Sequence, residues 1–144
     1  HRDLHSFPTR RSSDLLLFRM DLADSAPFEE MSGYAEKLSQ FLLRSCPSKA
    51  FLGRMDERKF ALLVERPEIE DLLPFARQTR MGLKSLAFPV SIGMASHTEG
   101  NPEACLERAL GCLRQSVKPG QILYWDPEEN QVKDLSERVT TRLE

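Results

Sequence analysis

The segment Gly53-Arg54-Met55-Asp56-Glu57-Arg58-Lys59-Phe60-Ala61-Leu62-Leu63-Val64 carries the strongest structural signal in the chain. It places a short charged run between the apolar residues 50–52 and 60–64. Short apolar runs are typical of buried strands, and charged turns are usually surface features. The segment therefore indicates two strands and an exposed turn. It contains no Asn-Gly or Asp-Gly hairpin signal, so the hairpin itself rests on the family resemblance given below.

Apolar runs and helical stripes elsewhere predict the other elements. Residues 15–21 form an apolar run that ends in Asp21, the pattern of a buried strand delivering a side chain at its carboxyl end. Residues 28–42 repeat apolar positions at helical intervals, which predicts an amphipathic helix ended by Cys46-Pro47. We expect, in addition, a helix opening near 67, a strand over 87–95, a helix opening at 101–103 and a strand over 121–125.

This order of elements favours an α+β sandwich, with helices packed against a largely antiparallel sheet. We expect one such domain over residues 15–126, which is long enough for a single core. Residues 127–144 are charged and carry only a narrow apolar stripe at helical spacing. They are predicted to form a C-terminal helix or a linker to a following domain.

The N-terminal residues 1–14 differ in composition from the rest of the chain. Residues 5–15 resemble the translation of a sequencing adapter, and they show no apolar periodicity. We interpret 1–14 as an artefact fused to a truncated gene, outside fold reasoning; the alternative is a disordered basic tail. Deleting this stretch is expected to leave stability unchanged.

Charge and cysteine content limit the function classes. Without residues 1–15 the chain has 17 basic and 20 acidic residues, which gives no electrostatic footprint for nucleic acid. Cys46, Cys105 and Cys112 form no CxxC pair and leave one thiol unpaired, which favours a reducing, cytoplasmic compartment. No apolar run approaches the roughly 20 residues needed to cross a bilayer, so we expect no membrane contact in this fragment.

Three anchors make the chain similar to a GGDEF domain, the family that includes the diguanylate cyclases. They are the strand ending at Asp21, the stretch from Arg54 to Phe60 followed by Ala-Leu-Leu-Val, and residues 91–95 (Ser-Ile-Gly-Met-Ala) with a helix and a Pro-Gly turn after them. The resemblance covers about residues 15–126. It implies a nucleotide-cyclase or ferredoxin-like sandwich, here with its N-terminal part truncated.

The same resemblance implies that the chemistry has been lost. Family cyclases join two GTP molecules into cyclic di-GMP with divalent metal on the triphosphate, and such ions need oxygen ligands. Asp21 matches the family's first metal-binding aspartate. Arg54 and Phe60 keep the frame of the motif, but the Gly, Gly, acid and acid positions hold Asp56, Glu57, Arg58 and Lys59. We therefore expect no catalytic residues, no metal and no cofactor, and Mg²⁺ only if an active cyclase is the correct alternative.

Other family features are also missing. Paired glycines that allow close backbone approach to phosphate are replaced by acids. The segment that reads guanine is shortened at residues 25–30, and the phosphate-contacting lysine falls on Val117, with Lys118 beside it on the expected helix. The inhibitory Arg-x-x-Asp motif falls on residues 47–50 and is absent.

Individual residues leave alternatives open. Arg58, Lys59 and Lys118 are candidate phosphate contacts, but a solvated hairpin tip is the simpler interpretation of the first two. Asp21 is a vestigial metal ligand, a cap of the following turn, or the partner of a base such as Arg58 or Lys59. Cys105 and Cys112, seven residues apart, are interpreted as buried apolar groups.

We hypothesise a non-catalytic GGDEF-like regulatory or dimerisation module of a bacterial cyclic di-GMP signalling protein. The alternatives are an active diguanylate cyclase and a GTP-binding sensor without turnover. The resemblance implies as partners another GGDEF-like domain, a following signalling domain such as an EAL-type phosphodiesterase, a second copy in a homodimer, or GTP.

Overall fold

The computed structural model describes residues 13–46, 49–65, 72–83, 88–97 and 102–135. They form a six-stranded sheet in the order β2-β3-β1-β4-β5-β6, in which β4 and β5 alone run parallel. The strands are β1 (Ser13–Met20), β2 (Ala50–Arg54), β3 (Lys59–Glu65), β4 (Val90–His97), β5 (Ile122–Asp126) and β6 (Gln131–Asp134). The largely antiparallel sheet predicted from the sequence is confirmed.

Strand β1 lies at the centre of the sheet and is buried on both faces. It pairs antiparallel with β3 on one side and with β4 on the other. Alternate residues point to opposite faces, so Leu16 and Phe18 enter one apolar cluster while Leu15 and Leu17 enter a second. A strand buried on both faces reads as a continuous apolar run, which is how the sequence presents it.

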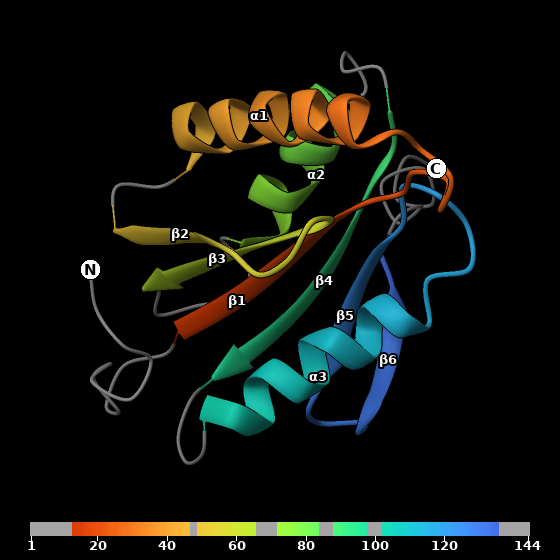
Figure 1. The fold of residues 1–144 in the computed structure, drawn as a ribbon. Helices are drawn as coiled ribbons and strands as arrows, with labels where there is room; N and C mark the ends of the chain where they lie inside the picture. The colour runs from red at the N-terminus through yellow and green to blue at the C-terminus, as the bar shows by residue number, and fades with distance from the viewer. Residues whose placement is uncertain (1–12, 47–48, 66–71, 84–87, 98–101, 136–144) are drawn as a thin grey trace, which may run out of the picture.

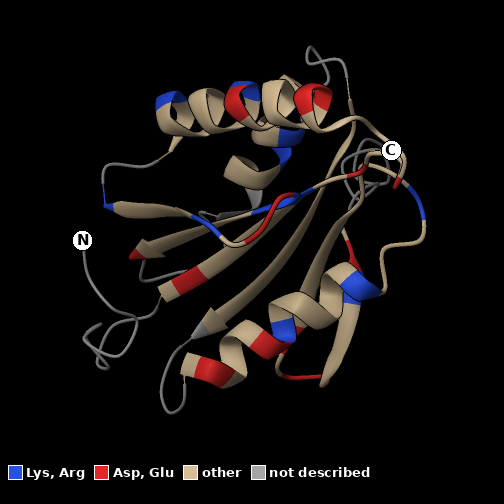
Figure 2. Cartoon of the chain, in the orientation of Figure 1, with Lys and Arg blue, Asp and Glu red and all other residues tan. Residues whose placement is uncertain are grey.

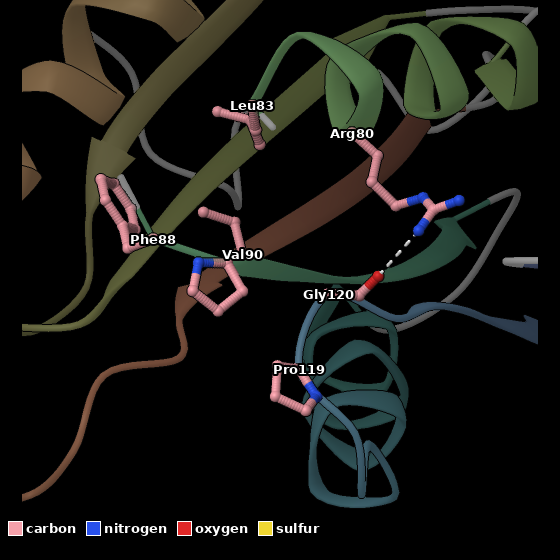
Figure 3. A pocket seen from close by; sticks show the side chains of 7 residues that line it. Arg80, Leu83, Phe88, Val90, Pro119 and Gly120 are labelled. Atoms are coloured by element: carbon pink, nitrogen blue, oxygen red, sulfur yellow. Dashed lines mark hydrogen bonds between the residues drawn. The ribbon is translucent and has the colours of Figure 1, made fainter. Parts of the chain in front are cut away.

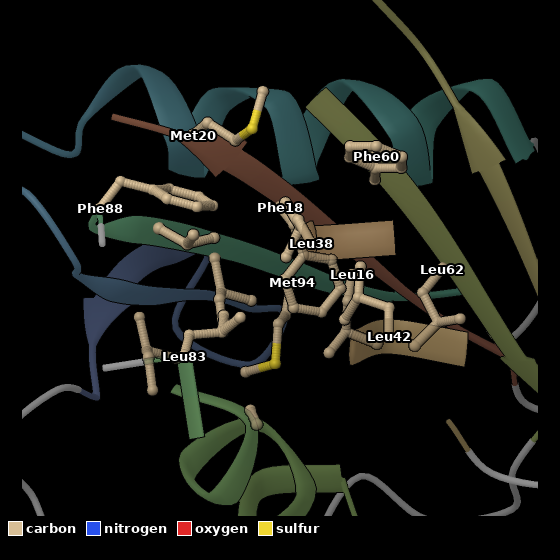
Figure 4. Packing of buried hydrophobic residues seen from close by; sticks show 14 of the residues in the cluster. Leu16, Phe18, Met20, Leu38, Leu42, Phe60, Leu62, Leu83, Phe88 and Met94 are labelled. Atoms are coloured by element: carbon tan, nitrogen blue, oxygen red, sulfur yellow. The ribbon is translucent and has the colours of Figure 1, made fainter. Parts of the chain in front are cut away.

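Two helices cover one face of the sheet and a third covers part of the other, as Figure 1 shows. Helices α1 (Phe28–Ser45) and α2 (Leu72–Leu83) lie over the larger cluster, in which Leu38 and Leu42 of α1 pack against Phe18 (Figure 4). Helix α3 (Pro102–Arg114) lies over β1, β4 and β5. The α+β sandwich with packed helices is thus confirmed.

Helix boundaries follow from local chemistry. Helix α1 begins after Pro27, with acids in its first turn, and ends where the N–H of Cys46 donates to the carbonyl of Leu42. Cys46 has extended backbone angles, as expected before a proline. Helix α3 opens at Pro102, the first helical position, where the missing N–H of proline costs nothing. The predicted opening of α2 near 67 lies outside the described residues.

The predicted N-terminal boundary is wrong by two residues. Ser13 and Asp14 belong to β1 and are each 1% exposed, so these two residues are part of the fold. They pair with Glu65 and Val64 of β3, and these partners extend the ladder past Leu15. Residues 1–12, for which an artefact or a disordered tail was predicted, lie outside the described residues.

The predicted C-terminal helix is also wrong where the structure describes it. Residues 131–134 form β6, an edge strand paired antiparallel with β5. Two tight-turn features explain this: the Asp126 carboxylate accepts the N–H of Glu128, and Asn130 has a left-handed φ of 56°. The spacing of Val132 and Leu135 had suggested a helix. Leu135 instead donates its N–H to Ile122 and is buried.

The close contact between α3 and β4 depends on Gly93. A Cβ atom there would stand 2.7 Å from the carbonyl oxygen of Ala109 and 3.2 Å from Cβ of Cys112. We expect Gly93→Ala to lower the free energy of unfolding by about 1–3 kcal/mol, because α3 must shift away from the sheet. Gly53→Ala in β2 is the matched control, since nothing lies within 4 Å of its added Cβ. Chemical denaturation would contradict this if both variants lost equal stability.

Candidate functional site

The charged turn between β2 and β3 is closed by its own side chains. The Asp56 carboxylate accepts the N–H groups of Arg58 and Lys59 at 2.8 and 2.9 Å, and Lys59 Nζ at 2.7 Å. Desolvation opposes the ionised form of Asp56, but these hydrogen bonds outweigh it and lower its pKa. Figure 2 shows the acidic and basic residues side by side in this turn. The predicted hairpin is confirmed by the register Arg54↔Phe60.

Arg54 and Phe60, the two residues that keep the motif's frame, hold the ends of the turn. Arg54 Nε donates to the carbonyl of Asp56 and Nη2 to that of Glu57, both at 3.0 Å. The same guanidinium lies 5.3 Å from the centre of the Phe60 ring, within cation–π range. Phe60 itself is buried in the larger cluster. Arg54 and Phe60 therefore stabilise the hairpin, and this structural role does not depend on catalytic activity.

Arg58 connects the hairpin to the end of β1. Its Nη1 donates to the carbonyl of Leu22 at 2.9 Å and its Nη2 to that of Ala23 at 3.1 Å. Its own carbonyl accepts the N–H of Met20 at 2.8 Å. The charged turn thus approaches the carboxyl end of β1, as predicted. The contact consists of hydrogen bonds from Arg58 to the backbone carbonyls of Leu22 and Ala23. Lys59 points back to Asp56 instead.

Asp21 lies at the end of β1 and is partly buried, with its side chain 10% exposed. Its Oδ1 accepts Arg19 Nε at 2.8 Å, and its Oδ2 accepts Ser91 Oγ at 2.6 Å and the Gly120 N–H at 3.0 Å. Arg19 also donates to the carbonyl of Leu113 at the end of α3. Three segments therefore meet at one carboxylate, namely β1, β4 and the turn before β5, and Arg19 links this carboxylate to the end of α3.

Of the alternatives for Asp21, pairing with a base is confirmed, but the base is Arg19 and not Arg58 or Lys59. Residues two apart in extended chain point to the same side, which brings Arg19 onto Asp21. The sequence does not predict Arg19, Ser91 or Gly120 as partners of Asp21, although Ser91 and Gly120 lie in one of the three anchors. The spacing of Arg19 and Asp21, two residues apart at the end of a predicted strand, is the sequence pattern that could have predicted this ion pair.

Lys118 lies in the turn after α3, because that helix ends at Arg114 and not, as expected, near residue 118. The N–H groups of Val117 and Lys118 both donate to Oε1 of Gln121, at 2.8 and 2.9 Å. Val117, which stands where the family has its phosphate lysine, is 83% exposed. Lys118 therefore belongs to a different segment from Arg58 and Lys59, and no described contact joins them.

A pocket of about 190 Å³ lies next to Gly120, lined mainly by apolar residues that include Leu83 and Phe88. Arg80 points across it and donates to the carbonyl of Gly120 at 3.3 Å (Figure 3). Gly120 adopts φ 75°, which allows its N–H to face Asp21 while its carbonyl faces Arg80. This volume is below the roughly 300–1,000 Å³ typical of small-molecule sites.

The arrangement does not fit a divalent metal ion. Asp21 is already neutralised by Arg19, and the guanidinium of Arg58 sits on the carbonyls that follow it. No group of three or more His, Cys, Asp or Glu side chains with metal-binding geometry occurs in the part of the chain that the structure describes.

Burial raises the pKa of Cys105 to about 12 and of Cys112 to about 11, so both thiols stay neutral.

The described residues form an α+β domain with a six-stranded, mostly antiparallel sheet and a charged hairpin beside an acidic strand end. Comparison with solved structures specifies it further: the chain has the fold of GGDEF domains. A GGDEF domain from an EAL/GGDEF protein of M. capsulatus superposes with a TM-score of 0.70 at 16% identity, covering 81% of this chain and 86% of that one.

Two further structures agree. The active GGEEF domain of a diguanylate cyclase from Vibrio cholerae gives a TM-score of 0.68 at 14% identity, covering 81% of this chain and 85% of that one. The GGDEF domain of FimX from Pseudomonas aeruginosa gives 0.70 at 17% identity, covering 78% and 80%. No family model and no curated protein matches the sequence. Among the described helices, none combines the length and apolar character that a bilayer span requires.

The buried carboxylate of Asp21 should be a large contributor to stability. We expect Asp21→Ala to lower the free energy of unfolding by about 3 kcal/mol, because it leaves Arg19 without its charge partner and removes two further hydrogen bonds. Glu107→Ala is the matched control, since Glu107 and Arg114 form an ion pair with side chains 73% and 65% exposed. That control should change stability by less than about 0.5 kcal/mol. Equal urea midpoints for the two variants would refute the role given to Asp21.

Proposed function

We propose that this chain is a non-catalytic GGDEF-like module of a bacterial cyclic di-GMP signalling protein, with a regulatory or dimerisation role. The fold of GGDEF domains supports the general class. The lack of catalysis is supported by one observation above all: guanidinium groups stand at both places where the chemistry would need a divalent cation. Arg19 neutralises Asp21, and Arg58 binds the carbonyls of Leu22 and Ala23.

Phosphoryl transfer from a nucleotide triphosphate depends on positioning and on stabilising the charge that develops on the phosphates. At the hairpin, Asp56 and Glu57 occupy the positions at which the family's glycines allow backbone approach. Asp56 is fixed by Lys59, and its carboxylate would repel a triphosphate. Neither charge stabilisation by metal nor close backbone approach is therefore available to GTP.

Partners follow from the role. A domain without its own chemistry acts by binding another domain, so a second GGDEF-like domain, a following signalling domain or a second copy of the chain is the expected partner. Among the solved structures with this fold, one pairs a diguanylate cyclase, SiaD, with an activator protein, SiaC. A GTP-binding sensor without turnover stays a second hypothesis, but the bases it would use, Arg58 and Lys59, already have partners in the protein.

Purified protein incubated with GTP and Mg²⁺ or Mn²⁺ should make no cyclic di-GMP, as measured by chromatography of the products. The Arg58→Asp, Lys59→Glu double variant should also be inactive, because two carboxylates do not restore backbone access to the phosphates. The active GGEEF domain from Vibrio cholerae serves as the positive control.

Cyclic di-GMP produced by the wild-type chain above a no-protein blank would overturn the proposal in favour of an active cyclase. Calorimetric titration with GTP separates the remaining alternatives. Binding without product, weakened by Arg58→Ala, would favour the sensor.

A further inference from the structure

We propose that Arg58 is a tethered cation: its guanidinium fills a cation position built from the chain's own oxygens and so holds the segment after β1 in its folded position. This inference goes beyond the regulatory role proposed above and does not require it. It concerns how the protein holds together the segment between β1 and α1, next to the buried Asp21.

The oxygens around Arg58 are of the kind that bind hard cations. Leu22 and Ala23 present successive backbone carbonyls at 2.9 and 3.1 Å from Arg58 Nη1 and Nη2, and the Asp24 carboxylate lies 3.8 Å away. Carbonyl and carboxylate oxygens are the ligands that Mg²⁺ and Ca²⁺ prefer in proteins. A guanidinium also satisfies them, because its planar fork offers two parallel N–H donors.

The two hydrogen bonds to carbonyls contribute more to the stability of this arrangement than the ion pair between Arg58 and Asp24 does. The Asp24 side chain is fully exposed, and an exposed pair at such a distance contributes little. The Arg58 side chain, by contrast, is only 24% exposed. A divalent ion at the same carbonyls would compete for the same lone pairs and would meet the positive charge of the guanidinium. Wild-type protein should therefore be indifferent to divalent metal.

Truncation of the side chain at position 58 measures what the guanidinium contributes to stability. The backbone of Arg58 keeps its own contacts, since its carbonyl accepts the N–H of Met20 and its N–H donates to Asp56. We therefore expect removal of the side chain to leave the hairpin register intact while it takes away the contacts to Leu22, Ala23 and Asp24.

The experiment compares Arg58→Ala with the wild type and with Arg114→Ala, in which an exposed arginine is removed. Arg58→Ala should lower Tm by about 5 °C, whereas Arg114→Ala should leave it almost unchanged. Millimolar methylguanidinium, too dilute to denature, should recover part of the loss in Arg58→Ala and have no effect on Arg114→Ala. Mn²⁺ or a chelator should not shift the Tm of the wild type.

An Arg58→Ala variant that melts like Arg114→Ala, or that methylguanidinium does not stabilise, would overturn the tethered-cation proposal. So would a rise in the wild-type Tm with Mn²⁺. If Arg58→Ala does not fold, Arg58→Lys gives the same test, because one ammonium group does not reproduce a two-donor fork: a Tm equal to wild type would overturn the proposal. Cyclic di-GMP synthesis, measured separately, decides the proposed function and leaves this result unaffected.

Discussion

The buried carboxylate of Asp21 is the constraint on which the arrangement of this end of the molecule depends. An ionised group that is largely removed from water must find partners, and Asp21 finds three, from β1, β4 and the turn before β5. Through Arg19 the same network reaches the carboxyl end of α3. The positions of β4, of the Gly120 turn and of α3 relative to β1 are therefore coupled at one side chain.

Next to this network, the hairpin turn also brings several charged side chains close together. It places two acids and two bases in four consecutive residues, and contacts within the hairpin hold several charged groups: Asp56 binds Lys59, and Arg54 binds the turn's carbonyls. The exception is Arg58, which reaches across to the segment after β1. The side chains of Asp56, Arg58 and Lys59 thus all have partners within the protein, and this is the physical basis for proposing a module that binds partners rather than substrate.

The sequence predicts an element correctly where the residues that specify it lie together in one short stretch. The apolar run of β1, the stripe on α1 and the proline at the start of α3 each report on local burial or backbone geometry, and all three elements formed as predicted. It failed at β6, because Val132 and Leu135 are compatible with either a helical stripe or an edge strand. The deciding features were the turn at Asn130 and the pairing with β5, and an apolar pattern does not encode a strand's partner.

The sequence by itself determined the fold class and the replacement of the motif's two glycines by acids and of its two acids by bases, because these depend on residue type and order alone. Only the tertiary structure decided what the remaining charged groups do. Asp21 pairs with Arg19 rather than with the hairpin, and Arg58 binds backbone carbonyls 35 and 36 residues away in the chain. The physical reason is that a charged side chain takes the partner that the folded backbone brings within hydrogen-bond distance, and that proximity arises only when distant segments pack together.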